Sequence, residues 1–201
     1  MTDTGVFDGD HYWDVIAEYA KASPDDILIR LTVANRGPEP ARLHLLPTLW
    51  FRNTWSWGAA YEEGRWPKPQ LSRADDHSAI AQHATLGRFR LTADDLPDGR
   101  SPEFLFTENE TNTQLLFAAP NESPHTKNDF HDYVVQGRND AARRDGGTKA
   151  AALYVIDLPA RGEQTVQLRL TAESEVNAQP FRDFKRAFAK RQADADAFYA
   201  E

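Results

Sequence analysis

The residues with the most evident chemistry form an aromatic stretch in the first third of the chain. Residues 43–58 read LHLLPTLWFRNTWSWG, and Trp66 follows after a short polar interval, so four of the five tryptophans lie between residues 50 and 66. Aromatic side chains bury large areas, and a buried indole N–H needs a hydrogen-bond partner. The stretch must therefore either lie under another element or form a contact surface. The predicted contact residues, for a carbohydrate or for another domain, are Trp50, Arg52, Asn53, Trp55, Trp57 and Trp66.

Two interpretations of this aromatic stretch stay open. In the first, it is a loop that lines a sugar site: flat indoles pack on pyranose faces, while Arg52 and Asn53 bind hydroxyl groups. In the second, the tryptophans anchor a long loop onto a sheet or form an interface, which is the commoner role of aromatic clusters. The second interpretation is favoured on frequency, and the function of the protein depends on which one holds.

The acidic residues offer no convincing pair for hydrolysis. Glycoside hydrolysis needs two carboxyl groups roughly 5–10 Å apart across the scissile bond. Glu108 and Glu110 lie on one side of an expected hairpin, and Asp75 and Asp76 lie in an expected loop. Neither sequence context suggests an apolar pocket that would raise a carboxyl pKa. We therefore assign no catalytic residue.

Metal, phosphate and nucleophile motifs are also lacking. His125, Asp129, His131 and Asp132 are possible ligands by type, but their spacing matches no closed zinc motif and the chain has no cysteine. There is no Gly-x-Ser-x-Gly elbow, and residues 146–149 do not complete a phosphate-binding loop. No metal and no cofactor are expected, and the Gly-Gly pair is expected to be a turn.

Composition limits the class of protein. The chain has 201 residues and a formal net charge of −8, from 23 basic and 31 acidic residues, which argues against a nucleic-acid-binding protein. No apolar run is long enough to span a membrane, and the N-terminus lacks the basic and apolar regions of a signal peptide. The absence of cysteine suits a reducing compartment. We expect a cytoplasmic protein that binds neither nucleic acid nor membrane.

Alternating apolar residues predict a mainly β fold. Residues 11–20, 27–33 and 42–51 read as three long strands joined by polar turns, which is typical of an antiparallel meander. Residues 103–107 and 114–118 are predicted to pair as a hairpin. The other predicted strands are residues 79–83, 87–91, 133–136, 149–158 and 164–171.

The period changes near the C-terminus. From Pro180 onward the apolar residues are spaced by three and four, as on one face of an amphipathic helix. Pro180 suits a first helical turn and Asp183 suits the helix dipole. We therefore expect residues 1–175 to form an antiparallel β-sandwich and residues 176–201 a linker helix that leads towards a catalytic domain absent from this sequence.

Long segments of the chain resemble a known family. They are DVIAEYAKASPDDILIRLTVANRGPEPARLHLLPTLWFRNTWSWG, LFTENETN, HDYVVQGRNDA and GTKAAALY. Together they look like the N-terminal region of glucosidase-like proteins related to glycoside hydrolase family 63, the group of the processing oligosaccharide glucosidases and their bacterial relatives. The resemblance runs from about Tyr12 to the helix that ends in ADAFYA.

The resemblance implies a layout and a role. In that family an N-terminal β-sandwich of the super-sandwich type precedes linker helices and an (α/α)6 barrel, and the barrel carries both catalytic acids of an inverting hydrolysis. No catalytic residue of the family can be transferred to a position in this chain. The expected role is thus a non-catalytic module that scaffolds the barrel and lines its substrate entrance. The alternatives are a free-standing carbohydrate-binding module with an exposed tryptophan platform, and a structural or self-associating β domain.

Overall fold

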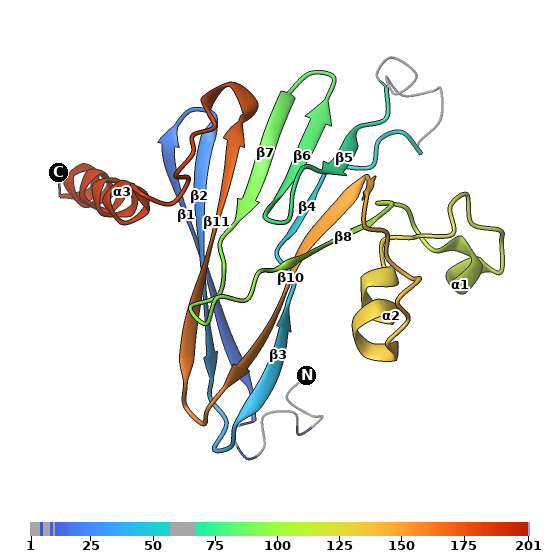
Figure 1. Cartoon of the computed structure of the whole chain (residues 1–201), viewed down its shortest axis with the longest axis horizontal. Helices are drawn as coiled ribbons and strands as arrows, with labels where there is room; N and C mark the ends of the chain where they lie inside the picture. Colours follow the sequence, from blue (N-terminus) through green and yellow to red (C-terminus); the bar gives the residue numbers. More distant parts are fainter. Residues whose placement is uncertain (1–4, 6–8, 10, 57–66, 201) are drawn as a thin grey trace. The chain divides into compact units, whose positions relative to one another are not determined.

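The computed structural model describes residue 5, residue 9, residues 11–56 and residues 67–200. Antiparallel strands are the commonest element in this part of the chain, which also has three α-helices (Figure 1). The strands are β1 (Trp13–Ser23), β2 (Asp26–Asn35), β3 (Ala41–Leu45), β4 (Thr48–Trp50), β5 (Gln70–Arg73), β6 (Ser78–His83), β7 (Gly87–Ala93), β8 (Glu103–Thr107), β9 (Gly146–Gly147), β10 (Lys149–Leu158) and β11 (Glu163–Ala172). The α-helices are α1 (Thr113–Phe117), α2 (Asp129–Gln136) and α3 (Phe184–Tyr199). The predicted fold class, an antiparallel β-sandwich with a C-terminal amphipathic helix, is confirmed.

The chain forms two compact units. The first consists of Met1–Leu45, Thr92–Ser101 and Tyr154–Glu201, and the second of Leu46–Leu91 and Pro102–Leu153. The long strand β10 contributes its first half to the second unit and its second half to the first. None of the helices in the described ranges combines the length and the apolar character needed to cross a bilayer.

In the first unit, β2 is the central strand between β1 and β11. It pairs antiparallel with both, with Ile16 opposite Thr32 and Leu168 opposite Ile29. The third strand of the predicted meander does not continue this sheet, because β3 pairs with the second half of β10. The meander prediction is therefore wrong at that strand. Short turns favour neighbouring strands, but they do not decide whether the next strand stays in the same sheet.

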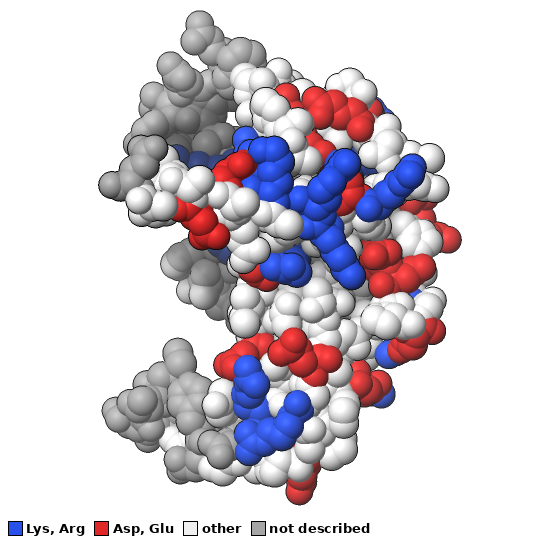
Figure 2. All heavy atoms as spheres, turned by 90° about the vertical axis from the view of Figure 1, so that its left-hand side faces the viewer, with Lys and Arg blue, Asp and Glu red and all other residues white. Residues whose placement is uncertain are grey.

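Helix α3 covers part of this sheet. Phe184 and Phe188 form a buried cluster with Ala20 and Leu28, and Figure 1 shows α3 beside β1. The predicted apolar face is therefore confirmed in the first turns, whereas Phe198 and Tyr199 at the end of the helix are exposed. Figure 2, which views the molecule from the left-hand side of Figure 1, shows basic side chains gathered in groups with acidic side chains around them.

A buried ionic network connects the sheet to the segment before α3. Arg169 and Asp26 are both almost fully buried; Arg169 donates to both carboxylate oxygens of Asp26, and Thr171 donates to the same carboxylate. The Arg169 guanidinium also donates to the carbonyl of Pro180 and, at 2.9 Å, to the carboxylate of Asp183. Burial raises the pKa of Asp26, but the hydrogen bonds from Arg169 and Thr171 outweigh it and leave this pKa lowered.

In the second unit, β7, β6, β5 and β9 are neighbours in that order, and the first half of β10 lies between β4 and β8. Its three consecutive alanines, 150–152, are completely buried, as are Phe104 and Phe106 of β8. Small side chains on both faces of β10 let the neighbouring layers approach closely. The prediction of a covered strand at residues 149–158 is confirmed.

Two strand predictions in this unit are wrong. Residues 114–118 mostly belong to helix α1, whose first turn is capped by the Asn112 side chain accepting from the Leu115 N–H. Residues 133–136 form the last turns of α2, which buries Phe130 and ends at Gly137 in the left-handed conformation. In both places local capping and a buried aromatic outweigh the strand preference of the apolar run. The predicted hairpin around residues 109–112 does not exist.

Candidate functional site

The aromatic stretch is held to the segment after β8 by a reciprocal pair of asparagines. Asn53 donates from its side chain to the carbonyl of Asn109 at 2.8 Å, and Asn109 donates back to the carbonyl of Phe51 at 2.9 Å. Asn53 also accepts from the Ser56 N–H, which closes a local turn. The residues that follow β4 therefore have a defined position although they form no strand.

The predicted contact residues divide into three groups. Trp50, at the end of β4, exposes 53% of its surface, and Arg52 is also exposed. Asn53 and Trp55 are half-buried, and the Trp55 indole Nε1 donates to Glu110 at 3.2 Å. Trp57 and Trp66 lie outside the described residues. The stretch is thus anchored through Trp55 and Asn53 and presents Trp50 to the surrounding solvent.

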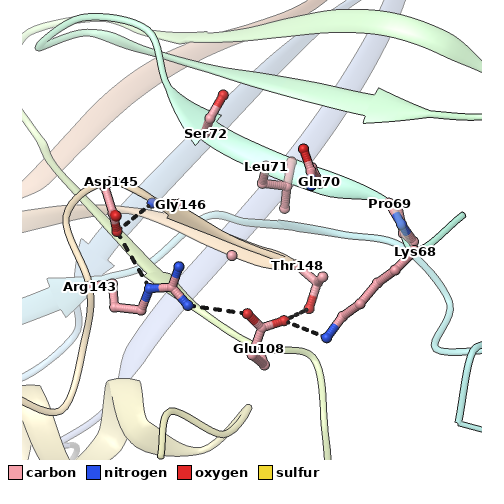
Figure 3. Close-up of a pocket in the computed structure, with 11 residues that line it drawn as sticks. Lys68, Pro69, Gln70, Leu71, Ser72, Glu108, Arg143, Asp145, Gly146 and Thr148 are labelled. Atoms are coloured by element: carbon pink, nitrogen blue, oxygen red, sulfur yellow. Dashed lines mark hydrogen bonds and ion pairs between the residues drawn. The ribbon is translucent and has the colours of Figure 1, made fainter. Parts of the chain in front are cut away.

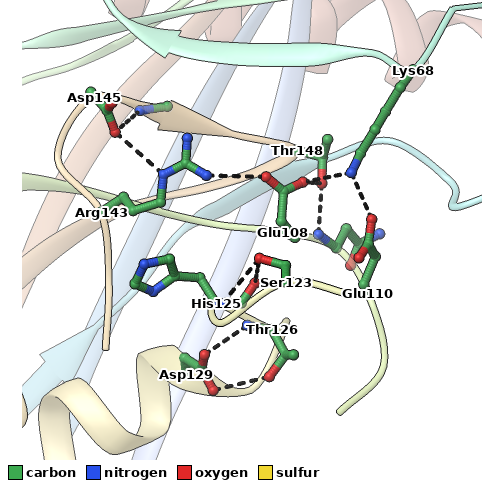
Figure 4. A network of polar contacts seen from close by, with 12 residues as sticks. Lys68, Glu108, Glu110, Ser123, His125, Thr126, Asp129, Arg143, Asp145 and Thr148 are labelled. Carbon is green, nitrogen blue, oxygen red and sulfur yellow. Dashed lines mark hydrogen bonds and ion pairs between the residues drawn. The ribbon is translucent and has the colours of Figure 1, made fainter. Parts of the chain in front are cut away.

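Two buried glutamates meet one lysine next to this stretch. Glu108 and Glu110 are each at most 9% exposed, and the Lys68 ammonium lies 3.1 Å from a Glu108 oxygen and 2.6 Å from a Glu110 oxygen. Figure 4 shows this network, in which Arg143 reaches Glu108 from the other side at 3.3 Å and Thr148 donates to Glu108 at 2.8 Å. Two cations thus neutralise two carboxylates.

The charges stabilise one another across this network. Burial alone lowers the pKa of Lys68, but its hydrogen bonds to Glu110 and Glu108 more than compensate, and the pKa is raised. The lysine therefore stays protonated between the two carboxylates. Its ammonium also lies 5.7 Å from the centre of the Trp55 ring, a distance at which a cation is attracted to the indole face.

The structure brings the two glutamates together, because both lie within hydrogen-bond reach of a single lysine nitrogen. A general acid, however, needs a proton, and a nucleophile needs a free lone pair. Because Lys68 holds both carboxylates and Arg143 also holds Glu108, this arrangement is that of an ionic clamp.

A pocket of about 310 Å³ opens beside Glu108 (Figure 3). Lys68 and Arg143 approach the Glu108 carboxylate from opposite sides. Gln70 and Ser72 of β5 add neutral polar groups to the pocket lining. Its floor includes Gly146 and Gly147. These glycines are not the predicted turn, because they form the short strand β9 that pairs with Leu71 and Ser72.

A second pocket, of about 500 Å³, adjoins the exposed indole. It is lined by Trp50, Asn53, Ser56, Asn109 and Thr111, together with the basic residues Lys127 and Lys149. Lys149 lies directly opposite Trp50 in the pairing of β10 with β4. This pocket therefore combines a flat apolar surface, neutral polar groups and two positive charges.

Three of the four candidate ligands in residues 125–132, namely His125, Asp129 and Asp132, form structural contacts. The His125 ring hydrogen-bonds the Ala141 carbonyl at 2.9 Å, Asp129 accepts from the Thr126 N–H at 2.6 Å, and Asp132 pairs with Arg138 at 3.0 Å. In the described ranges, no group of three or more His, Asp or Glu side chains is placed to hold a metal ion.

The comparisons with known proteins place the chain beside part of a longer protein. No protein-family model matches it. The uncharacterized protein YMR196W of Saccharomyces cerevisiae is 32% identical over 220 residues, an alignment that covers 94% of this chain and 20% of the yeast protein. The chain thus spans about a fifth of the length of this curated relative, and the similarity attaches no activity to it.

The sequence analysis missed the basic members of both pockets. Lys68 and Arg143 are distant in sequence from the glutamates that they neutralise, and Lys127 and Lys149 are brought together by a hydrogen bond from the Lys149 ammonium to the Lys127 carbonyl. One signal was available: Lys149 begins a strand that is otherwise apolar over its first residues.

Proposed function

We propose that this chain is a non-catalytic β-sandwich module of a larger glucosidase-like protein related to glycoside hydrolase family 63. In this proposal it scaffolds an (α/α)6 catalytic domain and lines its substrate entrance with the residues around Trp50. The observation that carries the proposal is the pocket beside Trp50, in which an exposed indole lies next to amide and hydroxyl groups. That combination suits a sugar ring, which has apolar faces and a polar rim. We also propose that the protein is cytoplasmic.

Further observations support a role as a module. The chain aligns with only a fifth of its yeast relative, which leaves room for other domains in a protein of that length. Helix α1 exposes three consecutive apolar side chains, Leu115, Leu116 and Phe117, and such patches commonly mark contact surfaces. The buried glutamates are held as an ionic clamp, which suits support of the aromatic stretch better than acid–base chemistry.

An assay of the purified chain tests the non-catalytic part. We expect no turnover of a nitrophenyl α-glucoside, and turnover that survives repurification would overturn it. The sequence of the gene beyond codon 201 tests the modular part. A reading frame that continues into several helical hairpins supports the proposal, and a stop codon at that point counts against it.

A free-standing carbohydrate-binding module is the second candidate, favoured by the exposure of Trp50. Calorimetric titration with gluco- and manno-oligosaccharides separates the two. Saturable binding by the chain alone that disappears in Trp50→Ala supports this candidate, especially if the gene ends at codon 201. Without such binding, a contact with another domain of the same protein remains the proposed role of the stretch.

A further inference from the structure

The two lysines of the Trp50 pocket lie in an unusual electrostatic environment. Lys149 is half-buried; its ammonium donates to the Lys127 carbonyl at 2.9 Å and lies 5.2 Å from the centre of the Phe130 ring. Burial and the nearby Lys127 charge both lower the pKa of Lys149. The Lys149 ammonium thus has a carbonyl and an aromatic ring as partners, but no described carboxylate.

No acidic partner among the described residues compensates this charge. The Lys127 ammonium donates to the Thr111 hydroxyl at 3.1 Å, and neither lysine forms an ion pair with a described carboxylate. The nearest acidic residues in sequence are engaged elsewhere: Asp129 accepts from Thr126, and Asp145 pairs with Arg143. Lys149 is half-buried and Lys127 is exposed, and two positive charges lie close together without a described carboxylate. An anion supplied from outside the described chain would complete this site.

The rest of the lining fits a sugar that carries such an anion. Lys149 and Trp50 are cross-strand partners, so their side chains leave the sheet next to each other and can contact one small ligand together. The side-chain oxygen of Asn109 receives no hydrogen bond from a described residue, because that amide is fixed through its nitrogen to Phe51. This oxygen can accept from a ligand hydroxyl.

From this arrangement we propose that the Trp50 pocket binds a pyranose bearing a phosphate or carboxylate group. The sugar ring stacks on the Trp50 indole, the anion lies between Lys127 and Lys149, and Asn109 accepts a ring hydroxyl. The inference deepens the proposed carbohydrate contact and rests on it. It assigns the ligand class, a negatively charged sugar, which neither the aromatic stretch nor the resemblance to glucosidases specifies.

Calorimetric titration of the whole chain at pH 7.5 and low salt tests the inference. The probes are glucose 6-phosphate, glucuronate, glucose and inorganic phosphate. We expect at least one of the two charged sugars to bind at least tenfold more tightly than both glucose and inorganic phosphate. Because the contact is ionic, its affinity should fall as salt is added. Binding of only one of them identifies the anion as phosphate or carboxylate.

The variants assign the binding to this pocket. Lys149→Gln and Trp50→Ala should each lower the affinity for the charged sugar at least tenfold. Lys149→Arg keeps the charge, so its affinity should fall less. Lys190→Gln on α3 is the matched control and should bind as the native chain does. Near-ultraviolet circular dichroism checks that each variant is folded.

The outcomes separate this inference from the proposed function. Equal affinity for glucose and the charged sugars overturns the anion assignment and leaves a neutral carbohydrate contact in place. Binding of inorganic phosphate as tight as that of glucose 6-phosphate shows an anion site without sugar recognition and also overturns it. Unchanged affinity in Lys149→Gln places any binding elsewhere. The gene sequence beyond codon 201 tests the modular role independently of all three.

Discussion

Lys149 lies directly opposite Trp50 in the antiparallel pairing of β10 and β4. This register places a cation that is partly withdrawn from water next to an indole that is half exposed to it. The Lys149 ammonium has the Lys127 carbonyl and the Phe130 ring as partners, but no described carboxylate. The proposed binding of a charged sugar rests on this missing partner.

Replacement of Lys149 by glutamine should not destabilise the protein at pH 7. Because the folded-state pKa of this lysine is lowered, its charge opposes folding at neutral pH, and the penalty disappears as the pH rises through that pKa. We expect the melting temperature of Lys149→Gln to equal or exceed the native value by up to a few degrees. The difference should shrink towards about pH 10.

Thermal melts monitored by circular dichroism check this expectation. Lys190→Gln is the control, because Lys190 forms an exposed pair with Asp194 one helical turn away. This variant should lose only a few tenths of a kcal/mol of folding stability. If Lys149→Gln melts well below that control at pH 7, the lysine contributes to the fold and the argument for an external anion loses its basis.

Replacement of Lys68 by methionine should destabilise the protein because it leaves buried Glu110 without its cation and Glu108 with Arg143 alone. Uncompensated buried charges are costly, and since Lys68 is itself 43% exposed we expect a loss of about 1–3 kcal/mol at pH 7. In the native chain the raised pKa of Lys68 means that its contribution is present below about pH 10 and is lost as the pH rises further.

Urea unfolding followed by tryptophan fluorescence measures this loss. Adding Glu108→Gln and Glu110→Gln to Lys68→Met should restore much of the stability, since the repulsion is then removed. Arg73→Met, which breaks an ion pair with the exposed Asp76, serves as the control and should change stability by less than about 0.5 kcal/mol. A triple variant no more stable than Lys68→Met would show that lost packing, and not repulsion between the two carboxylates, causes the destabilisation.

The sequence predicted those elements whose pattern is local. The alternation in β2 predicted a strand, and the small apolar residues of β10 predicted a covered strand. The Tyr-Val-Val run at 133–135 led to a wrong strand prediction. Its β preference is outweighed by the buried Phe130 and by Gly137 at the end of α2. Propensity is a weak guide where caps and burial oppose it.

The candidate site was predictable only in part. Trp50 and Asn53 of the predicted aromatic stretch line a pocket. The ionic clamp could not be inferred from the sequence. Lys68 lies just before β5, whereas Glu108 and Glu110 lie just after β8, and only the folded chain brings them into contact. Without the lysine, the two glutamates are indistinguishable from a chance acidic pair.

Replacement of Arg169 by methionine should cost about 3–5 kcal/mol, the usual effect of removing one partner of a buried ion pair. It leaves Asp26 buried with only Thr171 as a partner and releases the Asp183 contact ahead of α3.

The native pKa of Asp26 is lowered, so the pair's contribution to the free energy of unfolding is present above about pH 4 and is lost as the pH falls through the folded-state value. The difference in stability between Arg169→Met and the native chain should therefore be smaller at pH 3 than at pH 7. Urea unfolding at the two pH values measures this difference. Arg42→Met is the control, because Arg42 and its partner Asp157 are both more than half exposed. Equal losses of stability in the two variants would contradict the prediction.

Replacement of Gly147 by alanine should destabilise the second unit through a backbone clash. A Cβ atom at this position would lie 2.3 Å from the carbonyl oxygen of Thr107, so β8 and β9 must move apart. Overpacking of this kind costs about 1–3 kcal/mol or more, and it would also displace Thr148 and with it the hydrogen bond to Glu108. Gly87→Ala is the matched control: it has open space around the added methyl group but a φ of +84°, so it should lose only about 1 kcal/mol from backbone strain. Urea unfolding separates the two effects, and a Gly147→Ala variant as stable as Gly87→Ala would show that β8 and β9 are not packed as closely as the structure has them.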